Sequence, residues 1–206
     1  MAGGAANSRV MSPGSRHHRR RVLRCIAVTA LSIIVLIGLA VLIIWLVVQP
    51  SNVAYTLENA KVSNFNLSSQ KLNATFALDM KVRNPNKRIE IAYESIDVTV
   101  WYDDQTIALG SISGFVQPRR NTTKLDAVAV ADATPLQTKA WNDMKQQNSS
   151  KHEIDDVEVR LMSELRFKVG LWKSKKYRLK VSCWIKALPL GSSSRDIDSI
   201  DCDAEI

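Results

Sequence analysis

The hydrophobic residues of the chain form one long uninterrupted run near the N-terminus. Residues 26–48 contain no charged residue and no proline, and sixteen of these 23 residues are Ile, Leu or Val. A helix of this length measures about 34 Å, enough to cross a hydrocarbon core of about 30 Å. A buried helix of a soluble protein would carry a wider polar face, and a cleaved signal peptide would have a shorter apolar run. We therefore expect a retained transmembrane helix.

From residue 53 onward, apolar and polar residues alternate, which is the pattern of strands that bury one face. The clearest example is residues 72–83, whose expected inward set is Leu72, Ala74, Phe76, Leu78, Met80 and Val82. The same pattern predicts six further strands, near residues 96–102, 106–116, 122–131, 156–169, 177–185 and 202–206. About seven alternating strands predict an antiparallel β-sandwich.

Two local signals interrupt this series of strands. Gly110 and Gly114 indicate a bulge or a bend. Thr134 and Gln137 form a capping-box pattern around Pro135, a residue that fits the first position of a helix. An apolar stripe follows at Leu136, Ala140 and Met144. We expect one short helix, over about residues 135–147.

Charge is distributed unevenly along the chain. Six arginines and no Asp, Glu or Lys precede the apolar run, whereas the remaining chain has 22 Lys and Arg against 20 Asp and Glu. Most of the net charge of +8 therefore lies in a short tail. Arginines beside a membrane helix orient the helix with that side in the cytosol. Nucleic-acid binding would need a basic surface on a folded domain, so we expect no nucleic-acid partner.

These observations divide the chain into four expected parts. They are a disordered Arg-rich cytosolic tail (1–25), a transmembrane helix (26–48), a stalk (49–55) and one β-sandwich domain (56–206). About 150 residues are enough for one domain with its own core. Cys25 lies at the membrane boundary, where palmitoylation is one interpretation and a plain apolar helix residue is the other.

Asparagine and cysteine residues after the apolar run fit a compartment outside the cytosol. Four glycosylation sequons begin at Asn66, Asn73, Asn121 and Asn148, all beyond the expected membrane helix. Cys183 and Cys202 occupy inward positions of expected strands. These two cysteines can form a disulfide in an oxidising compartment, and two buried free thiols are the alternative.

The chain beyond the apolar run lacks the sequence patterns of enzyme active sites. It contains a single histidine, His152, in a polar stretch, and no HExxH, CxxC or Gly-rich phosphate loop. We therefore expect no catalytic residue, no cofactor and no metal site. The basic stretch at residues 173–180 has two interpretations, a solvated loop or a contact for anionic lipid.

Short motifs in this order resemble a known plant domain. They are Asn84-Pro85-Asn86, Ile91-x-Tyr93, Leu109-Gly110, Phe115-x-Gln117 and Asn121-Thr122-Thr123. Together they resemble the plant late-embryogenesis-abundant group 2 domain. With the Arg-rich tail and the apolar run, the chain resembles the harpin-induced-like and non-race-specific-disease-resistance-like membrane proteins of plants. Pro118-Arg119-Arg120 departs from the family, which usually has small residues there.

The resemblance implies both a fold and a function. The implied fold is an immunoglobulin- or fibronectin-III-like sandwich of about seven strands with one short helix. The implied function is that of a non-enzymatic, single-pass plasma-membrane protein in pathogen defence or stress signalling, with a protein partner at the cell surface. The rival hypothesis is a lipid- or ligand-binding sandwich that tethers the plasma membrane to the wall or to another membrane.

Overall fold

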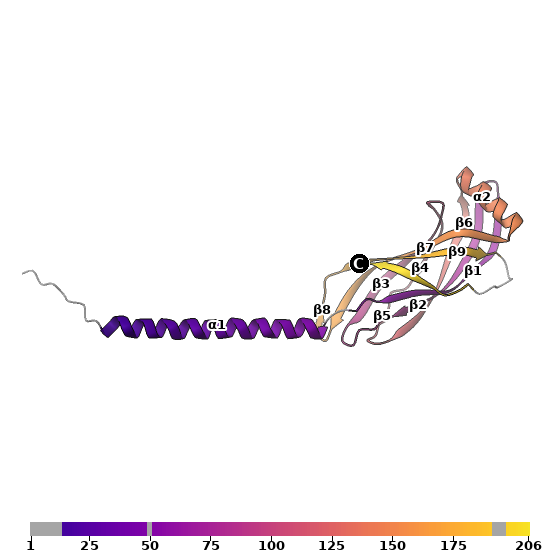
Figure 1. Cartoon of the computed structure of the whole chain (residues 1–206). Coiled ribbons are helices and arrows are strands. Elements are labelled where there is room, and N and C mark those ends of the chain that lie inside the picture. Colours follow the sequence, from indigo (N-terminus) through magenta and orange to yellow (C-terminus); the bar gives the residue numbers. More distant parts are fainter. Residues whose placement is uncertain (1–13, 49–50, 191–196) are drawn as a thin grey trace, which may run out of the picture. The chain divides into compact units, whose positions relative to one another are not determined.

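The structure is a computed structural model that describes residues 14–48, 51–190 and 197–206. The chain divides into two compact units, residues 1–49 and residues 50–206 (Figure 1). The first unit is the helix α1 (Gly14–Val48). Its stretch Arg21–Ile43 is long and apolar enough to cross a membrane, with a mean hydropathy of 3.0 and exposed side chains.

Helix α1 begins earlier than the sequence pattern predicts. The expectation of a disordered tail over residues 1–25 is wrong for residues 14–25, which are helical, and residues 1–13 lie outside the described part. Arginine is a good helix former, and extending an existing helix costs far less than starting a new one. The helix of the apolar run therefore extends toward the N-terminus and includes the arginines.

Within residues 51–190 and 197–206, the second unit has ten strands and one helix. Their bounds are β1 (Ala54–Ser68), β2 (Lys71–Arg83), β3 (Glu90–Tyr102), β4 (Gln105–Ile112), β5 (Val116–Gln117), β6 (Thr122–Pro135), α2 (Thr138–Ser150), β7 (Glu153–Val169), β8 (Trp172–Lys173), β9 (Tyr177–Pro189) and β10 (Ile200–Glu205). Eight of the strands pair in the order β3-β4-β6-β2-β1-β10-β9-β7, and β7 pairs again with β3. The two-residue strands β5 and β8 extend β3 and β7 at one end.

The expected seven-stranded sandwich is therefore corrected to a closed, antiparallel, eight-stranded barrel. A sandwich keeps two sheets with separate edges, but here β3 pairs along one side with β4 and along the other side with β7. Alternation along a strand shows which side chains point inward, but it does not show which strands are neighbours. The pattern also left out β1, whose alternation is disturbed by register shifts after Leu57 and after Ser63.

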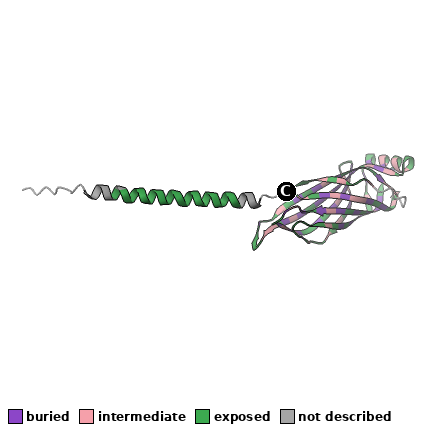
Figure 2. Ribbon diagram, turned by 60° about the horizontal axis from the view of Figure 1, so that its bottom comes forward, coloured by how far each residue is buried: buried purple, intermediate pink, exposed green. Residues whose placement is uncertain are grey.

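The barrel interior contains the apolar side chains that the alternation predicts. All six predicted inward residues of β2 are buried, and Figure 2 shows buried and exposed residues alternating along the strands. In β3 the buried set changes from odd positions (Ile91, Tyr93) to even positions (Ile96, Val98). The change coincides with a register shift against β7, so a bulge turns both Glu94 and Ser95 outward.

Helix α2 lies at one end of the barrel and starts later than expected. Thr134 and Pro135 remain in β6, where they pair with Leu72 and Lys71 of β2. The amide of Gln105 accepts a hydrogen bond from the backbone N–H of Gln137 (3.0 Å), so a side chain from another strand takes the place of the expected capping box. The predicted stripe of Leu136, Ala140 and Met144 is buried, so strand pairing moved the start of the helix and left its apolar face unchanged.

Gly110 marks a close backbone approach instead of the expected bulge or bend. It pairs with Ala129 of β6, and a Cβ atom added to Gly110 would lie 2.1 Å from the backbone oxygen of Val128. The obstacle is backbone and cannot rotate away as a side chain could. The register irregularity of β4 lies instead opposite Val100 and Trp101.

Replacing Gly110 by alanine should destabilise the barrel by at least about 1–3 kcal/mol, because β4 and β6 would have to separate locally. The midpoint of thermal unfolding of the purified chain, followed by circular dichroism, should fall by several degrees. Ser111→Ala, at the exposed neighbouring position, serves as the control and should leave the midpoint in place. Equal midpoints for the two variants would contradict the close approach.

Candidate interaction surface at the basic end of the barrel

One end of the barrel brings together the start of β1 and three loops, at residues 84–89, 113–121 and 170–176. The strand registers fix this arrangement, because Ala54 pairs with Arg83, Arg83 with Thr122, and Ile91 with both Gln117 and Phe167. We call this end, with these three loops, the basic end. The α2 end is the opposite one.

A buried asparagine organises the basic end. Asn84 is 1% exposed, and its side-chain amide donates to the carbonyl oxygens of Ile89 (2.9 Å) and Pro118 (3.0 Å). Its side-chain oxygen accepts from the backbone N–H of Asn86 (3.0 Å), which forms an Asx-turn. Pro85 lies between them and has no N–H group that needs a partner. One side chain therefore satisfies both the β2–β3 loop and the loop before β6.

Asn86 extends this network to the start of the second unit. Its side chain accepts a hydrogen bond from the backbone N–H of Ser51 and donates one to the carbonyl oxygen of Ser51, both at 2.8 Å. Its own carbonyl oxygen accepts from the backbone N–H of Arg120 (3.1 Å). The Asn-Pro-Asn motif is thus a structural clamp on three chain segments, and it brings no reactive group to the surface.

Two buried tyrosines, Tyr55 and Tyr93, lie near the same end of the barrel. The hydroxyl groups of Tyr55 and Tyr93 are 2.7 Å apart, and the ring of Tyr93 stacks on that of Phe115 with centroids 4.8 Å apart. Burial raises the pKa of Tyr93 to about 12 and raises that of Tyr55 still further. Both phenols therefore stay protonated at neutral pH. They act as a structural hydrogen-bonded pair and not as proton-transfer groups.

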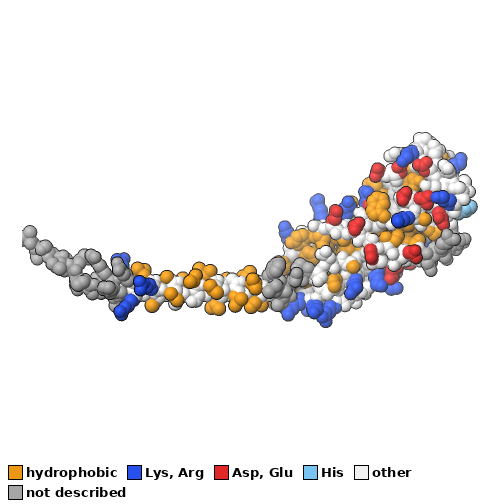
Figure 3. Space-filling model, in the orientation of Figure 1, with side chains coloured by type: hydrophobic (Ala, Val, Ile, Leu, Met, Phe, Trp, Pro, Cys, Tyr) orange, Lys and Arg blue, Asp and Glu red, His pale blue; other side chains and the backbone are white. Residues whose placement is uncertain are grey.

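The loops of the basic end carry a large excess of positive charge. The three loops together with the strand residues beside them, residues 83–90, 113–121 and 168–178, contain ten Lys or Arg against one Glu, a surplus of nine positive charges. In Figure 3, basic side chains gather along the lower left of the barrel, and acidic side chains lie mainly toward the α2 end. Lys87, Arg88, Arg120 and Lys173 are exposed and have no ion pair among the described residues.

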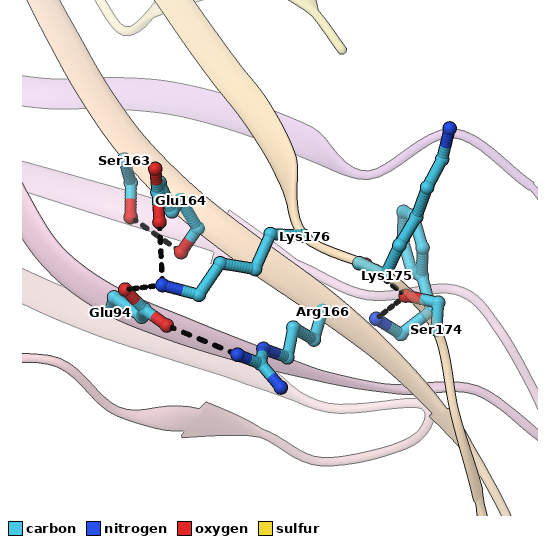
Figure 4. A network of polar contacts seen from close by, with 8 residues as sticks. Glu94, Ser163, Glu164, Arg166, Ser174, Lys175 and Lys176 are labelled. Carbon is cyan, nitrogen blue, oxygen red and sulfur yellow. Dashed lines mark hydrogen bonds and ion pairs between the residues drawn. The ribbon is translucent and has the colours of Figure 1, made fainter.

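Three glutamates near the basic end, Glu90, Glu94 and Glu164, are paired with basic side chains. Glu90 pairs with Arg119 (2.9 Å) and Lys168 (3.4 Å). Figure 4 shows Lys176 between Glu94 (2.8 Å) and Glu164 (2.7 Å). Lys176 precedes β9 and thereby holds its loop against the β3 bulge and β7. These pairs are exposed enough that each contributes little stability, but together they fix the position of the loop.

A rigid apolar tip projects from this fixed loop. Strands β7 and β8 form a hairpin around Gly170 and Leu171, with Gly170 at φ +59°, as a two-residue turn requires. Leu171 is 103% exposed and Trp172 is 62% exposed. The hydroxyl of Ser174 accepts from the backbone N–H of Phe167 (2.9 Å) and holds the base of the hairpin. Sequence reasoning identified the lysines of this loop but missed its apolar tip.

A second feature that sequence reasoning missed lies on the barrel wall. Glu158 is buried and forms two hydrogen bonds with Arg160, at 2.7 and 2.6 Å, and the Arg160 guanidinium lies 4.0 Å from the ring centroid of Trp101. The bonds from Arg160 hold the pKa of Glu158 below its usual range. Trp184, 56% exposed, borders the same shallow hollow. In a sequence, these residues look like an ordinary outward face.

The structure joins Cys183 of β9 to Cys202 of β10 by a disulfide, with the two Cα atoms 4.5 Å apart. Strand β10 lies between β1 and β9 and is antiparallel to both, so the bridge fastens the strand that completes the barrel. Formation of this bond in the protein stays a prediction. Cys25 lies in α1 as an exposed free cysteine, and its palmitoylation also stays a prediction.

The four sequons occupy different surroundings. Asn66 and Asn73 are cross-strand partners in β1 and β2, and the Asn73 side-chain oxygen accepts from the backbone N–H of Ala133 (2.8 Å). Asn148 is half-buried on α2. Asn121 is exposed in the loop before β6, at the basic end. Steric crowding makes simultaneous glycosylation of Asn66 and Asn73 the least favourable combination.

The single histidine beyond the apolar run belongs to no cluster of metal-ligating side chains in the described part of the chain. His152 lies exposed between α2 and β7, with a φ of 55°. Within residues 14–48, 51–190 and 197–206, no three His, Cys, Asp or Glu side chains gather as a metal site would require.

The fold and this end define a class of protein, a closed antiparallel barrel that follows an apolar helix and is held by a buried asparagine clamp. A family model described as late embryogenesis abundant protein matches residues 79–183. NDR1/HIN1-like protein 3 of Arabidopsis thaliana is 34% identical over 167 residues, covering 80% of this chain and 71% of that protein. NDR1/HIN1-like protein 2 of the same plant is 29% identical over 171 residues, covering 80% and 70%.

The chain belongs to the late embryogenesis abundant type 2 family, among its NDR1/HIN1-like members, which confirms the resemblance drawn from the motifs. A solved structure of another Arabidopsis thaliana protein gives a TM-score of 0.37 at 16% identity and covers 68% of this chain and 84% of that one.

Asn84→Ala should test the clamp. The change leaves the buried carbonyl oxygen of Ile89, the part-buried carbonyl oxygen of Pro118 and the N–H of Asn86 without their partner, at a cost of about 2 kcal/mol. Chemical denaturation of the purified chain should show this loss. Asn142→Ala, at an exposed position of α2, is the matched control and should change stability by less than about 0.5 kcal/mol. A mild effect at Asn84 would refute the clamp.

Cys202→Ser should loosen β10. Losing a bridge that closes a loop of this size lowers stability by about 3 kcal/mol in the chain-entropy model. Protease should then cut the last dozen residues while the rest of the barrel remains folded at low temperature. Mass spectrometry of non-reduced peptides from the native protein decides whether the bond exists, because free Cys183 and Cys202 peptides would disprove it.

Proposed function

We propose that this protein is a single-pass plasma-membrane protein whose barrel lies outside the cell, is non-enzymatic and acts in plant defence or stress signalling through a protein partner. The observation that carries the proposal is the combination, in one chain, of a helix long enough to cross a membrane and a family domain shared with NDR1/HIN1-like proteins. The proposed parts are a cytosolic tail (1–25), a membrane helix (26–48), a stalk (49–55) and the outer domain (56–206).

Charge and chemistry support this orientation. The arginines before the apolar run favour a cytosolic N-terminus. The four sequons and the cysteines Cys183 and Cys202 all follow the helix in the sequence, which fits a barrel in a compartment that supports glycosylation and disulfide formation.

The side-chain chemistry of the barrel supports a binding role over an enzymatic one. The buried ionisable groups Tyr55, Tyr93, Tyr102 and Glu158 bond to each other, to Gln147 or to Arg160. They are engaged in holding the fold, whereas an acid–base catalyst must reach its substrate.

A second candidate function is a lipid- or ligand-binding barrel that tethers the plasma membrane to the wall or to another membrane. The observation that favours it is the basic end, with its surplus of nine positive charges and its exposed Leu171 and Trp172. Such a surface suits anionic lipid better than an acidic or neutral surface would.

The proposed topology predicts that protease added to intact protoplasts digests a C-terminal tag and spares an N-terminal tag. The barrel should also carry glycans that a deglycosylating enzyme removes. Changing Arg19, Arg20 and Arg21 to Glu should produce mixed orientations, because the charge asymmetry sets the insertion. Protection of the C-terminal tag in the wild type would refute the orientation.

Whole plants test the role in defence or stress. Plants that lack the protein should show altered pathogen growth or stress tolerance, and the full chain should restore the normal response. A chain without residues 1–50 should fail to restore it even when it is secreted and folded. Restoration by this chain would show that the membrane helix is dispensable.

A further inference from the structure

We infer that the basic end of the barrel docks on the surface of the same bilayer that α1 crosses. In this arrangement Leu171 and Trp172 enter the headgroup region, and the surrounding lysines and arginines contact lipid phosphates. The inference rests on the proposed function, because it requires α1 to span the membrane. It names the residues that contact lipid. It also assigns the contact to the bilayer that α1 crosses, and not to a second membrane.

The apolar tip is the first line of support. Leu171 is 103% exposed and Trp172 is 62% exposed, so neither contributes appreciably to the core. The tight turn at Gly170 and the bonds of Ser174 constrain the backbone of the hairpin that carries the tip, so less backbone freedom is lost when it binds. Tryptophan favours the membrane–water interface, where its ring is in an apolar setting and its N–H group still meets water.

The charged residues around the tip indicate that the tip binds a phosphate-rich surface. Lys173 and Lys175 flank the tip, and Lys87, Arg88 and Arg120 come from the two neighbouring loops. The nearby carboxylates of Glu90, Glu94 and Glu164 are neutralised by their own ion pairs. A headgroup layer offers many phosphates in one plane, which matches cations that come from three separate loops.

The length of chain before β1 favours the host bilayer over a second one. Ala54, the first residue of β1, follows six positions after Val48, the last residue of α1. An extended chain covers at most about 3.6 Å per residue, so the start of β1 lies within about 22 Å of the last residue of α1 and stays close to a membrane that α1 crosses. The basic end is the end at which β1 starts, so it is the end tethered near this membrane.

Trp184 provides a matched control for Trp172. Its exposure is 56%, close to that of Trp172, but it lies on the barrel wall beside the Glu158–Arg160 pair. The other residues that border this hollow include Asp103, Asp104 and Asp156. An acidic surrounding repels anionic lipid, so docking through the basic end leaves Trp184 in water.

The test uses the full chain in vesicles of phosphatidylcholine with phosphatidylserine as a minor component, with brominated acyl chains as quenchers. All variants carry Trp45→Phe, which removes the tryptophan of the apolar run. Brominated host lipid should quench tryptophan emission, and Trp172→Phe should remove most of the quenchable part. Trp184→Phe should leave that part in place. Brominated lipid present only in added vesicles should quench little.

The electrostatic part is tested in the same vesicles. Lys173→Glu with Lys175→Glu should reduce the quenching, and raising the salt from about 0.1 M to about 1 M should do the same. The control pair Lys145→Glu and Lys186→Glu, both exposed and away from the basic end, should have no effect. Equal loss in the Trp172 and Trp184 variants, or quenching only by added vesicles, would overturn the docking.

Alkaline carbonate extraction separates the two proposals. A chain that remains in the membrane pellet but shows no quenching of Trp172 overturns the docking and leaves the proposed function intact. A chain released by carbonate overturns the membrane span and the docking together.

Discussion

The pairing of β3 with both β4 and β7 is the constraint on which the rest of the structure depends. It converts a row of strands into a closed ring in which each of the eight main strands pairs with a neighbour on both sides. Unpaired strand edges invite association with other chains, and closure reduces that hazard. It also brings the loops at residues 84–89, 113–121 and 170–176 to one rim, where the asparagine clamp joins the first two loops to Ser51.

Regular alternation explains which parts of this fold the sequence could predict. Strand β2 alternates without a break from Leu72 to Val82, and its bounds and inward face were predicted almost to the residue. The partners of each strand could not be predicted, because pairing depends on contacts between residues far apart in the chain. The start of α2 was misplaced for the same reason, since the long-range pairing of Pro135 with Lys71 outweighed a local capping signal.

The candidate surface was predictable only in fragments. The sequence marked Asn84-Pro85-Asn86 as a family motif, but its role depends on Ser51 and Pro118, which lie more than thirty positions away. The basic loop was visible as a run of lysines. Its apolar tip was also present in the sequence, as Gly170-Leu171-Trp172 ahead of those lysines, but exposure distinguishes a tip from a core strand, and exposure appears only in the structure.

The small net charge of the chain after the apolar run does not reveal how unevenly charge is distributed over the barrel. The chain after the apolar run has 22 basic against 20 acidic residues, a surplus of two, while the three basic-end segments alone have a surplus of nine. The other residues after the apolar run therefore have a net charge of −7. A body with this distribution has a preferred orientation near an anionic surface even though its total charge is small.

Glycosylation bears on the same orientation. Asn66, Asn73 and Asn148 lie toward the α2 end, away from the basic rim, so glycans there leave docking undisturbed. Asn121 follows Arg120 in an exposed loop of the basic end, and its backbone carbonyl is held by Asn84 and Gln117. A glycan on Asn121 would stand between this loop and the lipid. Occupancy of that one sequon therefore opposes docking, whereas occupancy of the other three is compatible with it.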